Sequence, residues 1–145
     1  MDSEPPTIHS QRTLSLRYNI PTTKTHRFWD SLKEGKLITT RCKDCGEVSF
    51  PPQADCPACM SGNSEWVDLG TEAELVTFTY VQVTPTSFVD SGPYHVAVGV
   101  LPNGLKLLAW VEGATTAELK PGVKLRLEAR LSASGSPYYV FVPVK

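Results

Sequence analysis

The residues with the clearest chemical potential are four cysteines, arranged as two pairs. Cys42 and Cys45 are separated by two residues, Cys56 and Cys59 repeat that spacing, and ten residues lie between the pairs. A C-x2-C turn aims two thiolates at one ion, and two such turns complete a tetrahedron that suits zinc at about 2.3 Å per sulfur. The sequence therefore predicts one metal ion held by Cys42, Cys45, Cys56 and Cys59.

Zinc is the preferred interpretation, but two alternatives stay open. A single iron ion uses similar four-thiolate sites and would indicate an electron carrier. Two disulfides would require an oxidising environment. Four protein ligands leave zinc no open coordination position, so the predicted ion is structural and stabilises a segment too short to have its own hydrophobic core.

The residues after each pair differ. Gly46 follows the first pair, where a positive φ is often needed. Met60 stands at the same place after the second pair, and Gly62 comes two residues later, which weakens the predicted turn geometry there but leaves the ligand set unchanged. The ten-residue gap is shorter than the commonest spacing of about 15–20 residues. It predicts a short β-hairpin that starts with residues 47–51 and then returns.

No other residues form a recognisable catalytic motif. His9, His26 and His95 lie outside any nucleophile motif, and phosphate-binding glycine patterns are absent. His95 is interpreted as a half-buried histidine in a strand. We therefore expect no catalytic residue and no independent enzymatic activity, and the sequence identifies no cofactor-binding residue beyond the cysteines.

The bulk composition favours a small folded protein. The 145 residues and the apolar fraction of 41% predict about one domain with a small addition. No apolar run approaches the roughly 20 residues of a membrane span. The first six residues lack the basic start and apolar stretch of a signal peptide. We expect a cytoplasmic protein with reduced cysteines.

Charge is unevenly distributed although the net charge is −1. Residues 12–43 have a balance of +6, residues 44–118 a balance of −9, and residues 119–145 a balance of +4. These segments can pair with each other, or they can meet a partner of opposite charge. Both interpretations stay open.

The chain is predicted to have three parts: an N-terminal arm with an amphipathic helix (residues 1–36), a zinc ribbon (37–65) and a β domain (66–145). Apolar residues at helical spacing predict a helix over about residues 26–34, with Thr25 as N-cap and Gly35 after its end. Phe28 and Trp29 are adjacent on this helix. They are either buried in the core or exposed as a docking face, because so short a helix must pack on something.

The β domain is predicted from strands of period two. Residues 123–131 alternate strictly between apolar and charged side chains, which indicates one buried and one solvated face. The predicted strands cover residues 72–83, 94–101, 105–112, 123–131 and 138–144, with a helical turn over residues 115–119. Five strands with a longer third connection match an OB-fold barrel, and a small β-sandwich is the alternative.

An OB-fold barrel can bind single-stranded nucleic acid when a basic groove presents aromatic side chains. Acidic residues outnumber basic ones in residues 66–145. Tyr80, Trp110, Tyr139 and Phe141 are candidate stacking residues, although burial in strands explains them equally well. Nucleic-acid binding is therefore an alternative function.

Three stretches together resemble the DUF35 family. Residues 27–37 resemble the helix that opens the family. Residues 41–46, 50–52 and 56–59 resemble its rubredoxin-like zinc ribbon, and Trp66, Gly70 and residues 75–80 resemble the start of its OB-fold domain. The similarity covers roughly residues 25–144.

The resemblance implies a mainly β protein with an N-terminal helix, a rubredoxin-like zinc ribbon and a C-terminal five-stranded OB-fold barrel. It also implies a non-catalytic accessory or bridging subunit of an acyl-CoA-processing enzyme complex, which helps to hold the CoA chain. The implied partner is a thiolase-like enzyme, HMG-CoA synthase or a hotdog-type hydratase. The alternatives are the nucleic-acid-binding protein and a rubredoxin-like electron carrier. The cationic arm, residues 12–43, would suit CoA phosphates or an acidic partner face.

Overall fold

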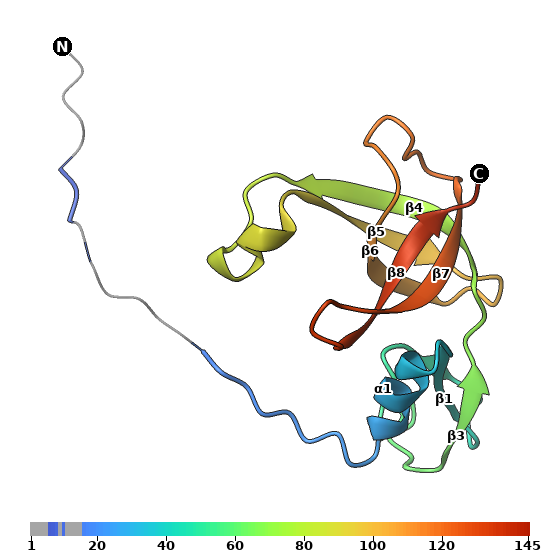
Figure 1. The fold of residues 1–145 in the computed structure, drawn as a ribbon. Coiled ribbons are helices and arrows are strands. Elements are labelled where there is room, and N and C mark those ends of the chain that lie inside the picture. Colours follow the sequence, from blue (N-terminus) through green and yellow to red (C-terminus); the bar gives the residue numbers. More distant parts are fainter. Residues whose placement is uncertain (1–5, 9, 11–15) are drawn as a thin grey trace.

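The computed structural model describes residues 6–8, 10 and 16–145, so His9 and Arg12 lie outside the described residues. The chain runs from an N-terminal segment into one α-helix, then a three-stranded sheet, then a barrel (Figure 1). The elements are α1 (His26–Lys33), β1 (Ile38–Cys42), β2 (Val48–Ser49), β3 (Ser64–Asp68), β4 (Glu72–Val81), η1 (Thr86–Ser91, a 3-10 helix), β5 (Tyr94–Val100), β6 (Lys106–Val111), β7 (Lys124–Leu131) and β8 (Pro137–Pro143).

The three-stranded sheet has β1 in its centre, paired antiparallel with β2 and β3. The predicted hairpin starting at residues 47–51 is wrong, because β2 pairs back with β1, with Thr40 opposite Ser49. On the other side, Thr40 is opposite Trp66 of β3. The three-part division at residues 36/37 and 65/66 stays a prediction.

The barrel is closed, with strand order β4-β5-β6-β8-β7. All five predicted strands are confirmed, each with ends within two residues of those observed. The sheet curls until β4 pairs with β7, and β6 and β8 run parallel. This closure rules out the β-sandwich and confirms the predicted OB-type fold class. The predicted helical turn at residues 115–119 is instead a turn in which the Glu118 carboxylate accepts a hydrogen bond from the Thr115 N–H at 2.7 Å.

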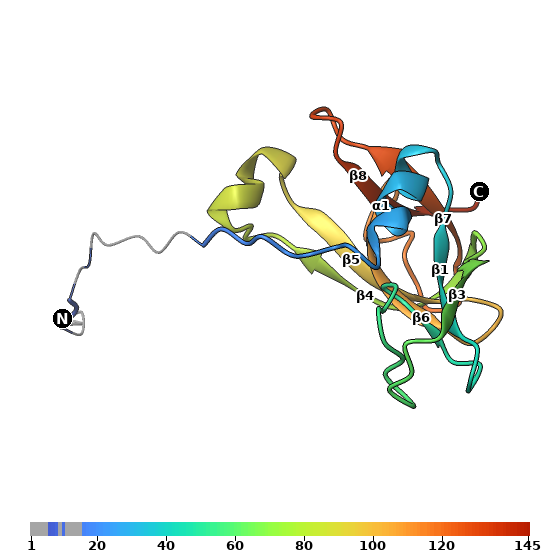
Figure 2. The same cartoon turned by 90° about the horizontal axis from the view of Figure 1, so that it is seen from below.

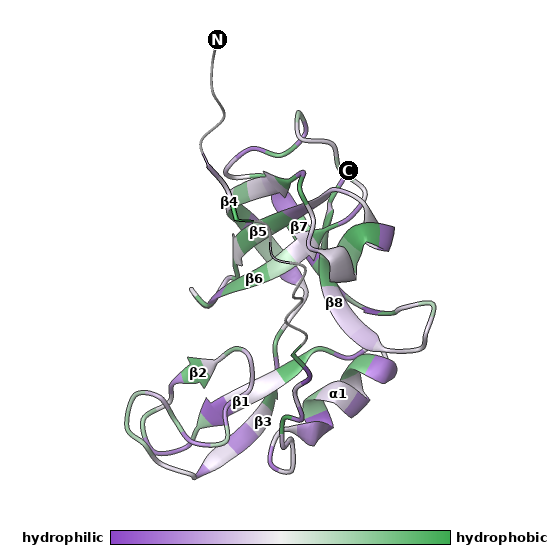
Figure 3. Ribbon diagram, turned by 90° about the vertical axis from the view of Figure 1, so that its left-hand side faces the viewer, coloured by the Kyte–Doolittle hydropathy of each residue, from purple (hydrophilic) through white to green (hydrophobic). Residues whose placement is uncertain are grey.

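Helix α1 joins the small sheet to the barrel (Figures 2 and 3). Phe28 and Leu32 are buried in the same hydrophobic cluster as the barrel residues Leu75 and Phe141. Gly35 follows the helix with φ +76°, as predicted. Thr25 occupies the N-cap position, but its side chain makes no cap hydrogen bond. Within the described residues, no helix combines the length and the apolar character that crossing a membrane requires.

Three aromatic rings from different parts of the chain meet where these parts join. Phe28 of α1 lies 5.8 Å from Phe50, which follows β2, and 6.2 Å from Tyr139 of β8, measured between ring centroids. Phe50 and Tyr139 are 5.1 Å apart, edge to face. Edge-to-face pairs of this kind add to the stability that burial gives. The rings therefore fix the three-stranded sheet against the barrel.

Candidate metal centre and aromatic groove

The first cysteine turn is built on the end of β1. The carbonyl of Cys42 accepts a hydrogen bond from the Gly46 N–H at 2.9 Å, and the Cys42 N–H donates to the Glu47 carbonyl at 2.8 Å. Gly46 has φ +80°, which glycine adopts without a Cβ penalty. These bonds fold the chain tightly enough to bring Cys42 and Cys45 together.

The second cysteine turn repeats this hydrogen-bond pattern. The Cys56 carbonyl accepts from the Met60 N–H at 2.9 Å, and the Cys56 N–H donates to the Ser61 carbonyl at 2.8 Å. Met60 has φ +63° and is the one described residue other than glycine with a positive φ. The turn geometry is thus kept although methionine replaces the expected glycine.

The four cysteines converge on one point. All four Sγ atoms lie within 4.8 Å of one another, with 3.6 Å between Cys42 and Cys59 and 3.5 Å between Cys45 and Cys56. A tetrahedral zinc ion with Zn–S bonds of about 2.3 Å requires sulfur–sulfur distances of about 3.8 Å. The arrangement therefore fits the predicted ion. Cys42 and Cys56 are buried, whereas Cys45 and Cys59 are exposed.

The crowded thiols do not ionise alike. The backbone N–H of Cys45, opposed in part by burial, lowers the pKa of Cys42 to about 7. The Glu47 N–H lowers the pKa of Cys45, but the neighbouring Cys56 and Cys59 thiols and burial outweigh it and raise that pKa to about 12. Like charges at such distances resist ionisation unless a cation neutralises them. The donor set is therefore one that a divalent cation would complete.

Asp44 links the two cysteine turns. Its carboxylate accepts a hydrogen bond from the Ser61 hydroxyl and another from the Asn63 side-chain amide at 2.9 Å. These two bonds, that of Ser61 first, hold the pKa of Asp44 below its ordinary value. Asp44 lies in the first turn and its partners follow the second, so this carboxylate holds the turns in register. Sequence analysis missed this role, although an acid between two ligand cysteines was a signal for it.

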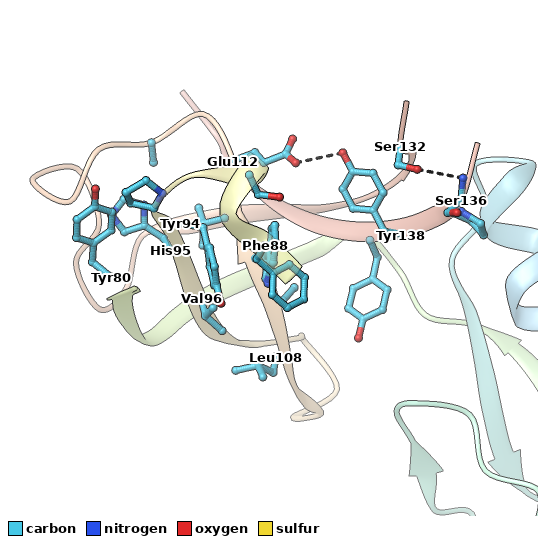
Figure 4. A pocket seen from close by; sticks show the side chains of 18 of the residues that line it. Tyr80, Phe88, Tyr94, His95, Val96, Leu108, Glu112, Ser132, Ser136 and Tyr138 are labelled. Atoms are coloured by element: carbon cyan, nitrogen blue, oxygen red, sulfur yellow. Dashed lines mark hydrogen bonds between the residues drawn. The ribbon is translucent and has the colours of Figure 1, made fainter. Parts of the chain in front are cut away.

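An open groove of about 1350 Å³ lies on the outer face of the barrel (Figure 4). Its floor holds Tyr94 of β5 and Trp110 of β6, whose rings stack at 4.3 Å and 14°. Phe88 of η1 contacts both rings edge-on, at 6.3 and 5.7 Å. Trp29 of α1 and the β7–β8 loop complete the border. The groove thus offers flat apolar surface of the kind that holds a planar or aliphatic group.

Three polar side chains of the groove, Glu112, Tyr138 and His95, already have hydrogen-bond partners. Glu112 accepts hydrogen bonds from the Tyr138 hydroxyl at 3.2 Å and from Arg130. Burial, more than the nearby Glu112 charge, raises the pKa of Tyr138. The His95 ring, 8% exposed, contacts the Thr116 hydroxyl at 2.8 Å, which agrees with its interpretation as a satisfied histidine. No described residue hydrogen-bonds the other ring nitrogen of His95, so this pair lacks the third group that orients a catalytic base.

The groove does not suit a polyanion. Among the described residues that border it there is neither lysine nor arginine, and the nearby Arg130 is already paired with Glu112. Of the four candidate stacking residues, Phe141 is fully buried and Tyr139 packs against Phe28 and Phe50. Tyr80 (Figure 4), Trp110 and Tyr139 border the groove. Nucleic-acid recognition needs cations beside exposed rings, so this face disfavours it.

The structure separates the two adjacent aromatics of α1. Phe28 is 2% exposed and belongs to the core, whereas Trp29 is 38% exposed and borders the groove. Sequence analysis missed the groove because its residues come from five separate segments. The concentration of aromatics at Phe88, Tyr94 and Trp110 was the one signal for it.

Comparisons with known proteins agree with this architecture. The rubredoxin-like zinc ribbon domain of ChsH2 matches residues 29–65, and the C-terminal OB-fold domain of ChsH2 matches residues 66–130. A DUF35 domain-containing scaffold protein of Pyrococcus furiosus is 30% identical over 105 residues, which is 72% of this chain and 76% of that protein.

Two further proteins are similar. The benzoylsuccinyl-CoA thiolase subunit BbsA of Thauera aromatica is 32% identical over 78 residues, or 51% of this chain and 50% of that subunit. The solved structure of the Ltp2-ChsH2(DUF35) aldolase matches with a TM-score of 0.73 at 22% identity, and covers 88% of this chain and 98% of that one. This structural match shows a shared fold.

Proposed function

This chain belongs to the DUF35 family, and from that membership we propose that it is a non-catalytic accessory subunit that bridges or completes an acyl-CoA-processing enzyme. One observation carries the proposal. The barrel carries an apolar, aromatic groove in which Glu112, Tyr138 and His95 already have hydrogen-bond partners, and its described residues contain no nucleophile–base–orienting set. Such a groove binds and positions, whereas the chemistry comes from a partner.

The relatives support the same role. One is named a scaffold protein and another a subunit of a CoA-ester thiolase. We infer that the partner of this chain is a thiolase-like enzyme, HMG-CoA synthase or hotdog-type hydratase.

The four cysteines would hold one zinc ion in a structural role. The ligand set is Cys42, Cys45, Cys56 and Cys59, and it leaves no coordination position for substrate. Bound zinc would cross-link the two cysteine turns and would not activate a water molecule. Reduced thiolates suit the cytoplasm, where we place the protein.

The groove would hold the acyl part of an acyl-CoA. Its stacked Tyr94 and Trp110 rings suit an uncharged group, whereas the absence of cations among its described border residues disfavours the CoA phosphates there. The phosphates would then face the partner or the cationic residues ahead of the ribbon. We assign binding of the acyl group to the barrel part, residues 66–145. The other two parts of the chain are the ribbon, residues 37–65, and the arm with its helix, residues 1–36.

The test is purification of the tagged full-length chain from its native cells, followed by mass spectrometry and reconstitution with the recovered subunit. We expect stoichiometric recovery of one acyl-CoA enzyme whose turnover rises when this chain is added. Trp110→Ala should weaken acyl-CoA binding to the reconstituted complex, whereas Leu131→Ala, an exposed position outside the groove, should not. Recovery of nucleic-acid-binding proteins, or a partner fully active alone, would overturn the proposal.

Measurement of the zinc content of the same sample tests the alternative that the chain is a rubredoxin-like electron carrier. One zinc per chain in a colourless protein is the expected result. A red protein with one iron per chain would instead support an electron carrier.

A further inference from the structure

Strand β4 leaves its neighbour β7 after its first few residues. The two strands pair over residues 72–74, and the Leu75 N–H then donates to the Val123 carbonyl at 2.8 Å. A bulge at Val76 follows, and an extra residue of this kind bends a strand and increases its twist. From Thr77 onward, β5 is the one described strand that pairs with β4, and the two extend together toward η1 and away from β7 and β8 (Figure 1).

The other edge of residues 77–81 is therefore open. Beyond Leu75, no described residue hydrogen-bonds the backbone along this edge. In an antiparallel sheet every second residue turns its N–H and C=O groups away from its partner strand. Thr77, Thr79 and Tyr80 are exposed, so another strand can reach these free groups.

This edge lacks the protection that the other free strand edges of the described chain carry. Proteins protect a free edge with a charged side chain, a proline or a very short strand. Strand β2 has only two residues, and the free edges of β3, β6, β7 and β8 carry Glu65, Lys106, Glu128 and Pro137 respectively. Residues 75–84 contain neither a charged residue nor a proline. The composition of this edge is that of a strand that another strand covers.

The residues of the edge are complementary to themselves. Opposite residues of an antiparallel pair point to the same face of the sheet, so a strand that pairs with its own copy has one residue opposite itself. With Thr79 at that position, the pairs between copies are Thr79 with Thr79, Phe78 with Tyr80, and Thr77 with Val81. Threonine pairs and aromatic pairs are among those that stabilise neighbouring strands. One set of residues thus supplies both sides of the contact.

Charge also permits this pairing. In the same register Glu74, the nearest charged residue on β4, lies opposite Thr84 of the second copy. Its carboxylate is already paired with Lys124 at 2.6 Å. No like charges therefore meet along the two strands, whereas they would oppose self-pairing if they did.

We propose that residues 77–81 of β4 pair antiparallel with the same residues of a second copy of this chain, around a twofold axis through Thr79. The two barrels then share one continuous sheet, in the order β6-β5-β4-β4-β5-β6. Thr79 lies opposite Val96, which lies opposite Trp110, so these side chains share one face. Because the axis is perpendicular to the sheet, the aromatic grooves of both copies open on that face. The pairing needs only this chain and does not rest on the accessory role.

The first measurement is sedimentation analysis of the isolated full-length chain across a concentration series, where we expect a monomer–dimer equilibrium. Thr79→Lys places two ammonium groups opposite each other and should weaken dimerisation about tenfold or more. Thr71→Lys, at an exposed threonine ahead of β4, is the matched control and should dimerise like the wild type. Melting temperatures at a concentration where all three are monomers should agree, since both threonines are exposed. A wild type that stays monomeric, or equal dimerisation of Thr79→Lys, would overturn the proposal.

Cysteine cross-linking tests the register. Thr79→Cys places two thiols opposite each other, with Cβ atoms about 4.5–5.5 Å apart, so mild oxidation should give a covalent dimer. Thr77→Cys is the control, because its two copies lie about 13 Å apart along the strands. A mixture of Thr77→Cys and Val81→Cys should cross-link again. Peptide mapping by mass spectrometry separates these links from any through the native cysteines, and equal cross-linking of Thr77→Cys and Thr79→Cys would refute the axis at Thr79.

Amide hydrogen exchange separates a second copy from a strand of the partner enzyme. Exchange should slow at alternate residues of 77–81 as the concentration of the isolated chain rises. Protection that appears only after the co-purified enzyme is added would assign the edge to that enzyme, and the self-pairing proposal would fall. Failure to recover an acyl-CoA enzyme would instead overturn the accessory role and leave the dimer in place.

Discussion

Met60 occupies the same position in the second cysteine turn that Gly46 occupies in the first. Both have a positive φ, +63° and +80°, and both donate their N–H to the carbonyl of the cysteine four residues earlier. A residue with a Cβ in this left-handed region costs about 1 kcal/mol relative to glycine. The Met60 side chain is 78% exposed, so its packing offsets little of this conformational cost.

Met60→Gly should therefore raise the free energy of unfolding by roughly 0.5–1 kcal/mol without loss of metal. Urea unfolding followed by circular dichroism, together with metal analysis, checks this. Gly46→Ala is the reverse control, since it places a Cβ at φ +80° and should destabilise. A less stable Met60→Gly protein would mean that the methionine side chain makes a contact that outweighs the strain.

Removal of the metal should unfold the ribbon. Structural zinc contributes on the order of 10 kcal/mol of apparent binding free energy, which the small sheet cannot replace by burial. Cys42→Ser and Cys56→Ser should each lose the ion, and a strong chelator should have the same effect on the wild type. Amide exchange would report unfolding of β1 to β3. Full zinc retention and unchanged melting in both variants would refute the ligand assignment.

Loss of the ribbon should also weaken the barrel, because Phe50 packs against Phe28 and Tyr139. The expected result is increased exchange at the amide of Tyr139 after chelation. Unchanged exchange there would show that the barrel is independent of the ribbon.

The two aromatics of α1 should respond oppositely to substitution. Phe28→Ala should lower the free energy of unfolding by about 3–5 kcal/mol, since this ring is buried in the core. Trp29→Ala should leave the melting temperature nearly unchanged and weaken binding of the partner or acyl group, because this ring borders the groove. Thermal melts and titration calorimetry separate the two effects. A large drop in melting temperature for Trp29→Ala with unchanged binding would contradict the assignment.

Gly99 of β5 cannot accept a side chain. A β-carbon at this position would lie 2.5 Å from Cζ of Phe141, and the Phe141 ring is fully buried. Gly99→Ala should therefore destabilise the barrel by about 1–3 kcal/mol through overpacking. Denaturant titration measures the loss. A double variant, Gly99→Ala with Phe141→Leu, should recover part of the stability.

The Glu128 carboxylate should make stability depend on pH on the acid side. Hydrogen bonds from Arg130, and next from Arg126, hold the pKa of Glu128 below its ordinary value. A lowered folded-state pKa stabilises the fold above the unfolded value of about 4.3, and this contribution disappears as the pH falls through the lower folded value.

Glu128→Gln should therefore lower the free energy of unfolding by roughly 0.5–1 kcal/mol at pH 7, and the difference should vanish in strong acid. Urea titrations across this range measure the difference. Glu74→Gln is the control, because the Glu74 carboxylate is more exposed and, within the described residues, forms an ion pair only with Lys124. A difference that persists unchanged at the lowest pH would contradict the charge-based explanation.

Local patterns determined the elements of this protein and the cysteine set. The alternation of residues 123–131 predicted β7 to within one residue, because which face a strand side chain occupies follows from its own period of two. The spacing of Cys42, Cys45, Cys56 and Cys59 predicted a common ion, because each C-x2-C turn is a local structure.

Only the tertiary structure decided how these elements combine. Pairing of β2 with β1, closure of β4 on β7, and burial of Phe28 but not of its neighbour Trp29 all depend on contacts between distant residues. The groove likewise gathers Phe88, Trp110 and Tyr138 from separate elements. Side-chain period carries no information on which strands will be neighbours, because many pairings bury the same apolar faces equally well.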